Sequence, residues 1–490
     1  MSLLGVDLGT SGVRVVAISA AGVEIAGAAR ATALHRPAPG IVETDADEVL
    51  AAATALLAEV AARDAVAADP PEAISFSVQG EAVLPVDAEG KALAPAPVSM
   101  DRRGVGLADQ VAAELGAGQV QRITGQRPHP MFSVYKIPGW TGPDVRGYRG
   151  LGDYVAARLG ARPALDTSMA ARTGGFDVDR GVWSAELLAA TGVPVALLPE
   201  VVPPGTMIGK LSADAAGATG LPAGLPLVVG SHDQASSFLG GGGRFGSAAV
   251  FSFGSSDCLT VGSPARPGGL VGTGLASYPM GEGRWLTLAG TAAGGWALDW
   301  FATLAGVAGP AERDALFEAA SPEPPQVLVL PYFAGSGTLD NDPRARGAVV
   351  GLTLETTREQ LARAFLESSA FELRKIADAL TERGVTIGAV HAVGGGARSH
   401  RTLAIRASAA GLALTPVPGH AAARGAALQA GAGIGRYPSL AELPAPACLP
   451  VAHPDPGTAQ WYAAQSRRFR DLYPTLIPHD RSFSDPKEIR

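Results

Sequence analysis

The chain has 490 residues, 47% of them hydrophobic and 17% charged, with a formal net charge of −7 at pH 7. A single hydrophobic core seldom organises so long a chain, so we expect two large domains. The net negative charge argues against binding to nucleic acid or to an anionic membrane surface. The two cysteines, Cys258 and Cys448, provide neither a disulfide framework nor metal-ligand spacing. The N-terminus lacks a basic leader, and Glu59 interrupts the apolar stretch 49–62. These features and the cysteine content predict a cytoplasmic protein without a membrane span.

The first half of the chain predicts an antiparallel meander followed by helices and strands. The meander covers residues 3–30, with turns at 9–12 and 20–22. Asp45 and Asp47 cap a helix that continues to residue 63. Further apolar strands are predicted at 73–78, 82–86 and 226–230. The four consecutive glycines 240–243 then predict a hinge or a domain boundary.

The second half contains the strongest helix pattern, at 357–383, which begins after Thr356 or Thr357 and ends at Gly384. A predicted strand at 389–393 then runs into the glycine turn 394–399, and a helix follows at 400–410. A strand, a glycine turn and a helix N-terminus in this order favour binding of phosphate or ribose at the backbone. The alternation of strands and helices predicts the α/β fold class.

One kind of phosphate-binding turn occurs twice. The turn 7–12 follows the apolar run 3–6, and the turn 253–257 follows the apolar run 248–251. Glycine lets backbone N–H groups converge on an anion, and nearby hydroxyl groups add donors. The hydroxyl-bearing residues are Thr10, Ser11, Ser255 and Ser256. The recurrence indicates a duplicated domain with a nucleotide between the copies, and two ordinary hairpins with polar turns are the alternative.

The more common nucleotide motifs do not fit. The segment 205–211 is one residue short of a P-loop and lacks the Ser or Thr after Lys210. The glycines 394–396 do not have dinucleotide-binding spacing, because Ser399 holds the last position.

Acids and amides at strand ends are the candidate catalytic residues. Asp7, beside the first turn, can hold Mg²⁺ through water, and Asp233 can accept a proton from a hydroxyl nucleophile. The alternative is that both aspartates cap turns. Gln79 and Glu81 can bind sugar hydroxyls or can be solvated turn residues, and His232 can be a ligand or a structural histidine.

Taken in order, these motifs resemble those of the FGGY family of carbohydrate kinases over residues 3–435. The matching segments are Asp7-Leu8-Gly9-Thr10, Gln79, Asp101-Arg102-Arg103, Asp153-Tyr154, Gly230-Ser231-His232-Asp233-Gln234, Gly254-Ser255-Ser256, Gly294-Gly295, the turn 394–399 and Phe469-Arg470-Asp471-Leu472-Tyr473. The resemblance implies two actin-like (ribonuclease H-like) domains with an interdomain cleft. We expect an N-terminal domain at 1–240 with the sugar site and the first phosphate turn, an ATP-binding domain at 247–437, and a tail with a helix at 438–490.

The implied activity is that of an ATP-dependent, xylulokinase-like enzyme that phosphorylates a hydroxyl of an unspecified ketose or polyol and uses Mg²⁺. Asp233 is the expected catalytic base. Expected substrate contacts are Gln79, Glu81, Asp101, His232, Asp233 and Gln234. Expected ATP contacts are Gly9, Thr10, Ser11, Arg14, Gly254, Ser255, Ser256, Gly294, Gly395, Gly396, Ala397 and Ser399, and expected metal ligands are Asp7 and Asp233.

The chain departs from the family at its sugar loop. Gly80 stands where glycerol kinases have an Arg, and Met131 and Ser99 stand where they have a Tyr and a Trp around the substrate. Xylulose kinases usually have Met-His at the Gly80-Glu81 position and an Asn where this chain has Gln234. These differences predict a substrate other than glycerol, with room for a larger one, and leave xylulose open. The family's acid before Gly425-Ala426-Ala427 is also missing.

Two other function classes stay open. One is a catalytically inactive sugar- and ATP-binding regulatory protein on the same scaffold, against which the retained Asp7 and Asp233 argue. The other is an actin- or chaperone-type ATPase, which would need no sugar loop at 79–81. The expected partners are the small-molecule substrate and ATP, without nucleic acid or membrane, and a homodimer is possible.

Overall fold

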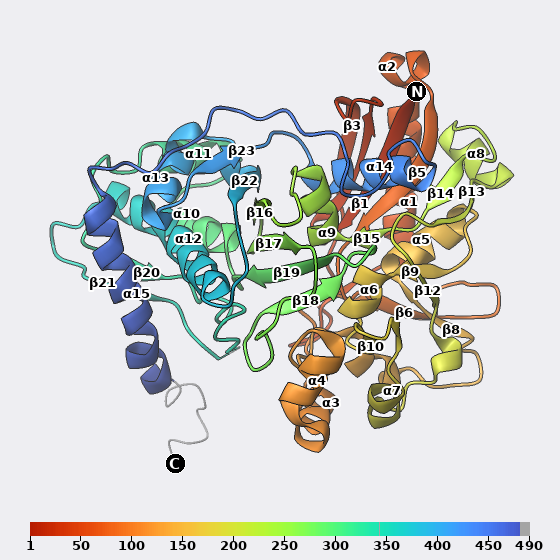
Figure 1. Cartoon of the computed structure of the whole chain (residues 1–490), viewed down its shortest axis with the longest axis horizontal. Coiled ribbons are helices and arrows are strands. Elements are labelled where there is room, and N and C mark those ends of the chain that lie inside the picture. The colour runs from red at the N-terminus through yellow and green to blue at the C-terminus, as the bar shows by residue number, and fades with distance from the viewer. Residues whose placement is uncertain (343, 481–490) are drawn as a thin grey trace.

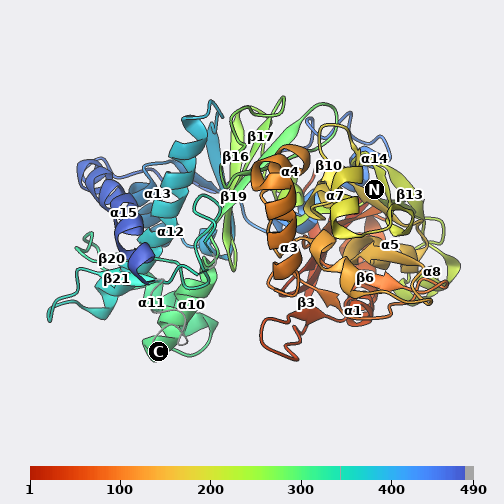
Figure 2. The same ribbon diagram turned by 90° about the horizontal axis from the view of Figure 1, so that it is seen from below.

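The computed structural model describes residues 1–342 and 344–480. It has two lobes, each built around a mixed β-sheet with helices packed on its faces (Figures 1 and 2). The helices are α1 (Ala46–Ala61), α2 (Asp64–Ala68), α3 (Val105–Val111), α4 (Ala117–Thr124), α5 (Leu151–Leu159), α6 (Thr167–Arg172), α7 (Ala185–Thr191), α8 (Ala213–Thr219), α9 (Asp233–Gly240), α10 (Gly295–Leu304), α11 (Pro310–Glu318), α12 (Arg358–Thr381), α13 (His400–Ala410), α14 (Ala421–Gly433) and α15 (Ala459–Asp480).

The N-terminal sheet has seven strands in the order β13-β14-β5-β1-β2-β3, with β15 beside β5. Their bounds are β1 (Ser2–Gly9), β2 (Gly12–Ile18), β3 (Glu24–Ala31), β5 (Pro71–Val78), β13 (Met207–Lys210), β14 (Pro226–Val228) and β15 (Ser231–His232). β1 pairs antiparallel with β2 and parallel with β5. The meander predicted at 3–30 is therefore confirmed.

The C-terminal sheet repeats this arrangement in the order β18-β19-β17-β16-β22-β23. Its strands are β16 (Ala248–Phe253), β17 (Asp257–Ser263), β18 (Ala276–Pro279), β19 (Trp285–Gly290), β22 (Ala389–Gly394) and β23 (Leu414–Pro416). β16 pairs antiparallel with β17 and parallel with β22, as β1 does with β2 and β5. The two glycine turns that are predicted to bind phosphate thus occupy equivalent positions in two copies of one fold, and the predicted α/β class is confirmed.

Short strands form small sheets outside the two main ones. They are β4 (Glu43–Thr44) with β7 (Ala96–Pro97), β6 (Val83–Val86) with β8 (Gly147–Gly150), β9 (Ala164–Asp166) with β12 (Glu200–Val202), β10 (Phe176–Asp177) with β11 (Val182–Trp183), and β20 (Leu328–Leu330) with β21 (Ala348–Val350). The strand predicted at 82–86 thus belongs to a separate two-stranded sheet.

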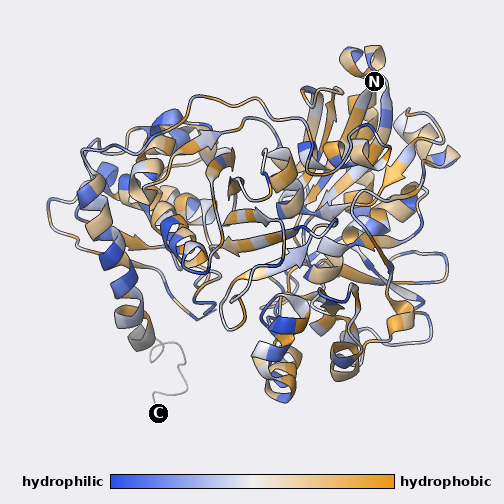
Figure 3. Cartoon of the chain, viewed as in Figure 1, coloured by the Kyte–Doolittle hydropathy of each residue, from blue (hydrophilic) through white to orange (hydrophobic). Residues whose placement is uncertain are grey.

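Each main sheet has its own hydrophobic core, and a third cluster joins the lobes. Leu4, Phe76 and Leu57 lie in the N-terminal core, and Phe251 and Phe371 lie in the C-terminal core. In Figure 3 the central strands are coloured largely as hydrophobic, whereas helix α15 at the edge carries many hydrophilic residues. None of the helices in the described part of the chain has the length and apolar character needed to cross a bilayer.

Helix α14 follows the C-terminal sheet in the chain but packs against α9, β1 and β5 of the N-terminal lobe (Figure 1). The packing is close, because a Cβ on Gly425 would lie 1.8 Å from the carbonyl oxygen of Ser236, and one on Gly240 would lie 1.8 Å from that of Ala421. The glycines 240–243 are buried, and Gly240 packs against α14. The hinge or domain boundary expected at this run stays a prediction. The domain boundaries at 240, 247 and 437 stay a prediction.

Candidate active site

A cleft of about 860 Å³ lies between the lobes and is lined by the glycine turns of both sheets. Its lining includes Asp7, Gly9, Thr10, Ser11, Arg14, Asp233, Gln234, Gly254, Ser255, Ser256, Gly395 and Ala397. These residues come from the β1–β2 turn, the start of α9, the β16–β17 turn and the end of β22. The fold thus brings together, around one cavity, most of the residues predicted for nucleotide and metal.

The first turn carries a buried carboxylate. Asp7 lies at the end of β1, where the Ser77 hydroxyl donates to its Oδ1 at 2.8 Å and Arg14 Nη1 lies 3.5 Å from its Oδ2. Burial raises the pKa of Asp7 above its ordinary value, although Ser77 and Arg14 act in the opposite direction. Asp7 Oδ1 is therefore held by Ser77 of the N-terminal sheet, and Oδ2 lies next to the Arg14 guanidinium at the cleft.

The second turn is fixed to the start of α10. Gly295 donates its backbone N–H to the Gly254 carbonyl at 2.8 Å, and Gly294 donates to that of Ser255 at 2.9 Å. Beneath the turn, burial raises the pKa of Asp257 to about 7, against the charge of Arg406. A Cβ on Gly294 would lie 2.2 Å from Asp257 Oδ1, so Gly294 supports the turn from behind and is not part of the cleft lining.

The third turn follows β22. Gly395 and Ala397 line the cleft, whereas Gly396 packs on Phe253, where a Cβ would lie 2.8 Å from the Phe253 Cβ. Arg406 donates to the Gly396 carbonyl at 2.8 Å and stacks over the Phe253 ring. Ser399 caps α13 by accepting from the Thr402 N–H. Gly396 and Ser399 therefore shape this turn from outside the cleft lining.

Asp233 begins α9 at the floor of the cleft. Burial, and then the negative charges of Asp7 and Glu81, raise its pKa to about 7, while Arg172 acts in the opposite direction. Its Oδ1 lies 3.1 Å from His232 Nε2. A carboxylate with a pKa near neutrality is suited to take a proton from a hydroxyl group and to release it again.

His232 is held by both lobes. Its Nδ1 lies 2.8 Å from the hydroxyl of Tyr278 on β18, and its backbone N–H donates to Ser168. Burial lowers the pKa of His232 well below its ordinary value, so the ring is neutral. A Tyr278 hydroxyl that donates to Nδ1 places the ring proton on Nε2, which is the atom next to Asp233.

A buried network fixes the strand before Asp233. Ser231 donates to Asp166 Oδ2 at 2.5 Å, and Ser168 donates to Oδ1 at 2.7 Å. Gln429 of α14 donates to the Ser231 hydroxyl at 2.7 Å. The position of Asp233 thus depends on α14, whose residues are almost 200 positions away in the chain.

Arg172 occupies the region beside the sugar loop. Its guanidinium forms an ion pair with Glu81 and donates to Gln126, and its Nη2 lies 3.9 Å from Met131 Sδ. Glu81 is buried and has a φ of +69°. A Cβ on Gly80 would lie 3.3 Å from Arg172 Nε and 3.1 Å from the His232 ring. Gly80 stands where glycerol kinases have an arginine, but a cation is still present in this region, because α6 supplies Arg172.

The remaining predicted substrate residues have different surroundings. Gln79 accepts from the Thr10 hydroxyl at 3.0 Å, which connects the sugar loop to the first phosphate turn. Gln234 lines the cleft. The Asp101 carboxylate accepts from Arg103 and from the Val42 N–H. These contacts lower its pKa, and Asp101 is not in the cleft lining.

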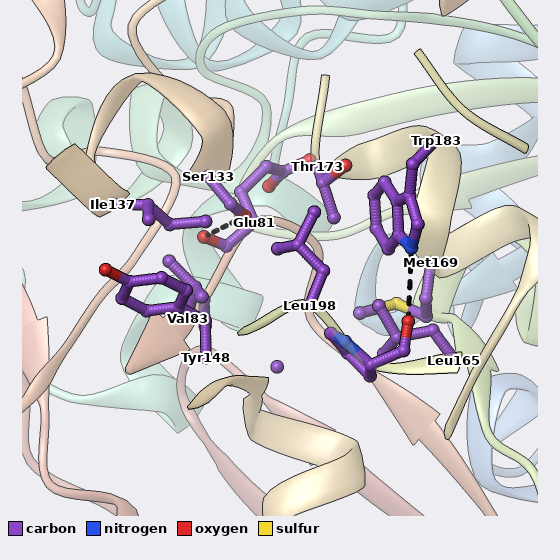
Figure 4. A pocket seen from close by; sticks show the side chains of 13 residues that line it. Glu81, Val83, Ser133, Ile137, Tyr148, Leu165, Met169, Thr173, Trp183 and Leu198 are labelled. Carbon is purple, nitrogen blue, oxygen red and sulfur yellow. Dashed lines mark hydrogen bonds between the residues drawn. The ribbon is translucent and has the colours of Figure 1, made fainter. Parts of the chain in front are cut away.

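A small pocket lies behind Glu81 (Figure 4). It has a volume of about 20 Å³, room for one water molecule. Its walls are mostly apolar, with Val83, Ile137, Leu165 and Trp183 among them. Ser133 donates to the Glu81 carbonyl at 3.0 Å, so the pocket wall also holds the sugar loop in place.

Three residues near the site were not predicted from the sequence, namely Arg172, Trp296 and Arg406. Arg172 and Arg406 are buried cations on helices, and their types alone carry no functional signal. Trp296 directly follows Gly294-Gly295, which was the available signal for it. No cluster of three or more metal-ligating side chains occurs among the described residues.

Two related lobes with glycine turns on a shared cleft, and two aspartates beside them, define a phosphotransferase with the actin-like (ribonuclease H-like) fold. The sequence models for the N-terminal and C-terminal domains of the FGGY family of carbohydrate kinases match residues 2–240 and 249–434. The chain belongs to this family, as its motifs suggested. It is an ATP-dependent carbohydrate kinase, with an alcohol group as phosphoryl acceptor.

Similar proteins include two kinds of kinase. A glycerol kinase from Citrifermentans bemidjiense is 31% identical over 454 residues, which cover 88% of this chain and 90% of that protein. The xylulose kinase of Escherichia coli is 29% identical over 490 residues, which cover 97% of this chain and 99% of that protein. The crystal structure of a xyloylose kinase from Brucella ovis superimposes with a TM-score of 0.86 at 28% identity, and the match covers 97% of this chain and 99% of that one.

Proposed function

We propose that the enzyme transfers the γ-phosphoryl group of ATP to a primary hydroxyl of an uncharged ketose or polyol, with Asp233 as the general base. The observation that carries this proposal is the position of Asp233 on the floor of the cleft, with a pKa raised to about 7. As the acceptor oxygen bonds to phosphorus and the bond to the β-phosphate oxygen breaks, Asp233 takes the hydroxyl proton.

The triphosphate would lie against the turns 9–11 and 254–256, which line the cleft from opposite lobes. Backbone N–H groups and hydroxyls in both turns are suitable donors for phosphate oxygens. Each lobe contributes one turn, so closure of the lobes would bring both sets of donors to the phosphates and exclude water.

Asp7 and Asp233 fit a Mg²⁺ ion. Mg²⁺ is commonly held by one or two carboxylates while water and phosphate oxygens complete its shell, so a cluster of three side-chain ligands is not required. Both aspartates line the cleft, and the buried Asp233 Oδ1 accepts no hydrogen bond although His232 Nε2 lies 3.1 Å from it. When bound, Mg²⁺ neutralises phosphate charge.

The sugar site favours an uncharged acceptor. The Arg172 guanidinium is already paired with Glu81 and bonded to Gln126, so it is not free to bind a substrate carboxylate. Glu81, Gln79, His232 and Gln234 would select hydroxyl groups. That curated relatives include both glycerol and xylulose kinases is consistent with an acceptor of this class.

The test compares turnover with nucleotide affinity in the Asp233→Ala and Asp233→Asn variants. Both should lose about 10²–10⁴ in turnover, since neither side chain can take the proton, while calorimetry should still detect ATP binding. Asp7→Ala should lose turnover and also weaken Mg²⁺-dependent ATP binding. Asp214→Asn, at an exposed position on α8, is the control.

The assay measures ADP release across a panel of ketoses and polyols. An Asp233→Ala enzyme that keeps more than about a tenth of the turnover would lie outside the range for loss of a base. Asp233 would then be a turn cap, and the proposed mechanism would be wrong.

A further inference from the structure

The cleft lining contains apolar as well as polar residues. The apolar ones include Trp296, Ala397, Pro416, Val417 and Leu449. Leu449 is held beside Pro416, because its backbone N–H donates to the Pro416 carbonyl at 2.9 Å. Apolar side chains cannot form hydrogen bonds with phosphate or sugar hydroxyl groups, whereas an exposed aromatic ring such as that of Trp296 can stack on a flat aromatic group.

Trp296 is fixed relative to the second phosphate turn. It is the second residue of α10, and its backbone N–H donates to the Ser255 carbonyl at 3.2 Å. The preceding Gly295 donates to Gly254. Trp296 is 39% exposed and lines the cleft, so part of its surface is available to a ligand whose phosphates contact residues 254–256.

The next tryptophan on α10 has a different environment. Trp300 lies one helical turn further along, and its ring packs against Phe333 at 4.6 Å between centroids. It contributes to the packing between α10 and its neighbours and is not part of the cleft lining. The two tryptophans thus differ in whether they face the nucleotide cleft.

We propose that Trp296 stacks on the nucleobase of ATP and so positions the nucleotide for transfer. This rests on the proposed function, which places the triphosphate at the turns 9–11 and 254–256. Stacking of a base on an aromatic ring contributes binding energy that tolerates different bases, since every base has a π-face. Trp296 therefore acts on nucleotide affinity and leaves acceptor selection to the sugar loop.

The experiment measures binding of two probes, ATP and inorganic tripolyphosphate, to the wild-type protein and to Trp296→Ala. Loss of the stack should weaken ATP binding about fivefold or more and leave tripolyphosphate affinity unchanged, because the latter has no base. Quenching of tryptophan fluorescence by ATP should disappear in Trp296→Ala. Trp296→Phe should recover part of the ATP affinity, and Trp300→Phe is the matched control.

The outcomes separate the two proposals. An ATP affinity that is unchanged in Trp296→Ala, while tripolyphosphate competes with ATP in the wild-type protein, would overturn the stacking role alone. Tripolyphosphate that does not compete with ATP would contradict the assignment of the phosphate turns and with it the proposed function. Equal weakening of both probes would show that Trp296 acts through the turn at Ser255, which also contradicts stacking.

Discussion

The guanidinium of Arg172 forms a buried ion pair with the carboxylate of Glu81. The pair joins α6 to the sugar loop, and the guanidinium lies where a side chain on Gly80 would point. It also stacks over the Phe132 ring at 5.1 Å. The orientation of Glu81, the proposed substrate contact, therefore depends on a residue that is 91 positions away in the sequence.

Arg172→Met should raise the KM for the sugar about tenfold or more and leave the KM for ATP unchanged, because Glu81 loses its charge-assisted hydrogen bonds. Steady-state kinetics with each substrate varied in turn would measure this. Arg158→Met, at an exposed position on α5, is the control. A variant with an unaltered sugar KM would show that the pair only stabilises the fold.

The same variant should be less stable, because an unpaired Glu81 would stay buried. Removing one partner of a buried ion pair costs about 3–5 kcal/mol. The double variant Arg172→Met/Glu81→Gln should recover much of this loss in chemical denaturation. A double variant as unstable as Arg172→Met would indicate that the packing of Arg172 on Phe132 dominates.

The pH dependence should follow Asp233. Because its carboxylate has to be ionised to accept a proton, kcat/KM should fall below a pH of about 7, where the group protonates in the folded protein. Burial and the charges of Asp7 and Glu81 cause the shift, so Glu81→Gln should move the apparent pKa downward. A pH profile that is flat between 5.5 and about 8 would contradict Asp233 as the base.

The same shift has a consequence for stability. The folded-state pKa of about 7 exceeds the ordinary value of 3.8, so the folded protein binds this proton more tightly than the unfolded chain does. Stability from this group is therefore complete at low pH and is lost as the pH rises through 3.8 toward about 7. Asp233→Asn should raise the melting temperature at pH 8 and change it little at pH 3.5. No difference between the two pH values would show that the carboxyl has an ordinary pKa.

Glycerol should not be the best acceptor. Gly80 offers no side chain, Met131 offers a thioether in place of a phenol, and the N–H groups of Arg172 are engaged by Glu81 and Gln126. A small triol would leave buried polar groups unpaired, and mismatches of this kind can cost orders of magnitude in kcat/KM. A panel of glycerol, tetritols, pentuloses and hexuloses would test this. If glycerol had the highest kcat/KM, the account of the sugar loop would be wrong.

The parts of the site that could be predicted from the sequence are those with local chemistry. Gly9, Gly254 and Asp233 follow apolar strands directly, and turn residues at strand ends have recognisable composition. Arg172 and Trp296 could not be predicted in the same way. Their roles depend on which distant segments the fold brings near them, and an arginine or a tryptophan on a helix is usually a surface or packing residue.

The glycine run 240–243 shows what composition alone leaves open. Glycine permits flexible linkers, but it also permits two helices to approach closely, and only the structure distinguishes the two. Here the partner of Gly240 is α14, which begins 181 residues later (Ala421 against Gly240) and contains Gly425 at the same crossing. The sequence contains no local signal that α14 packs on the N-terminal sheet.

Gly425→Ala should damage both stability and catalysis. The new Cβ would lie 1.8 Å from the carbonyl oxygen of Ser236, and contact with backbone cannot be relieved by a side-chain rotation, so α14 has to move away from α9. Overpacking of this kind costs about 1–3 kcal/mol or more. Because Asp233 begins α9, the shift should lower kcat as well.

Gly217→Ala in α8 is the matched control, since a Cβ there meets no atom within 4 Å and alanine favours a helix. Thermal unfolding and turnover of both variants would measure the effects. A Gly425→Ala enzyme with the stability and kcat of the Gly217→Ala enzyme would show that the α9–α14 crossing tolerates separation and does not position Asp233.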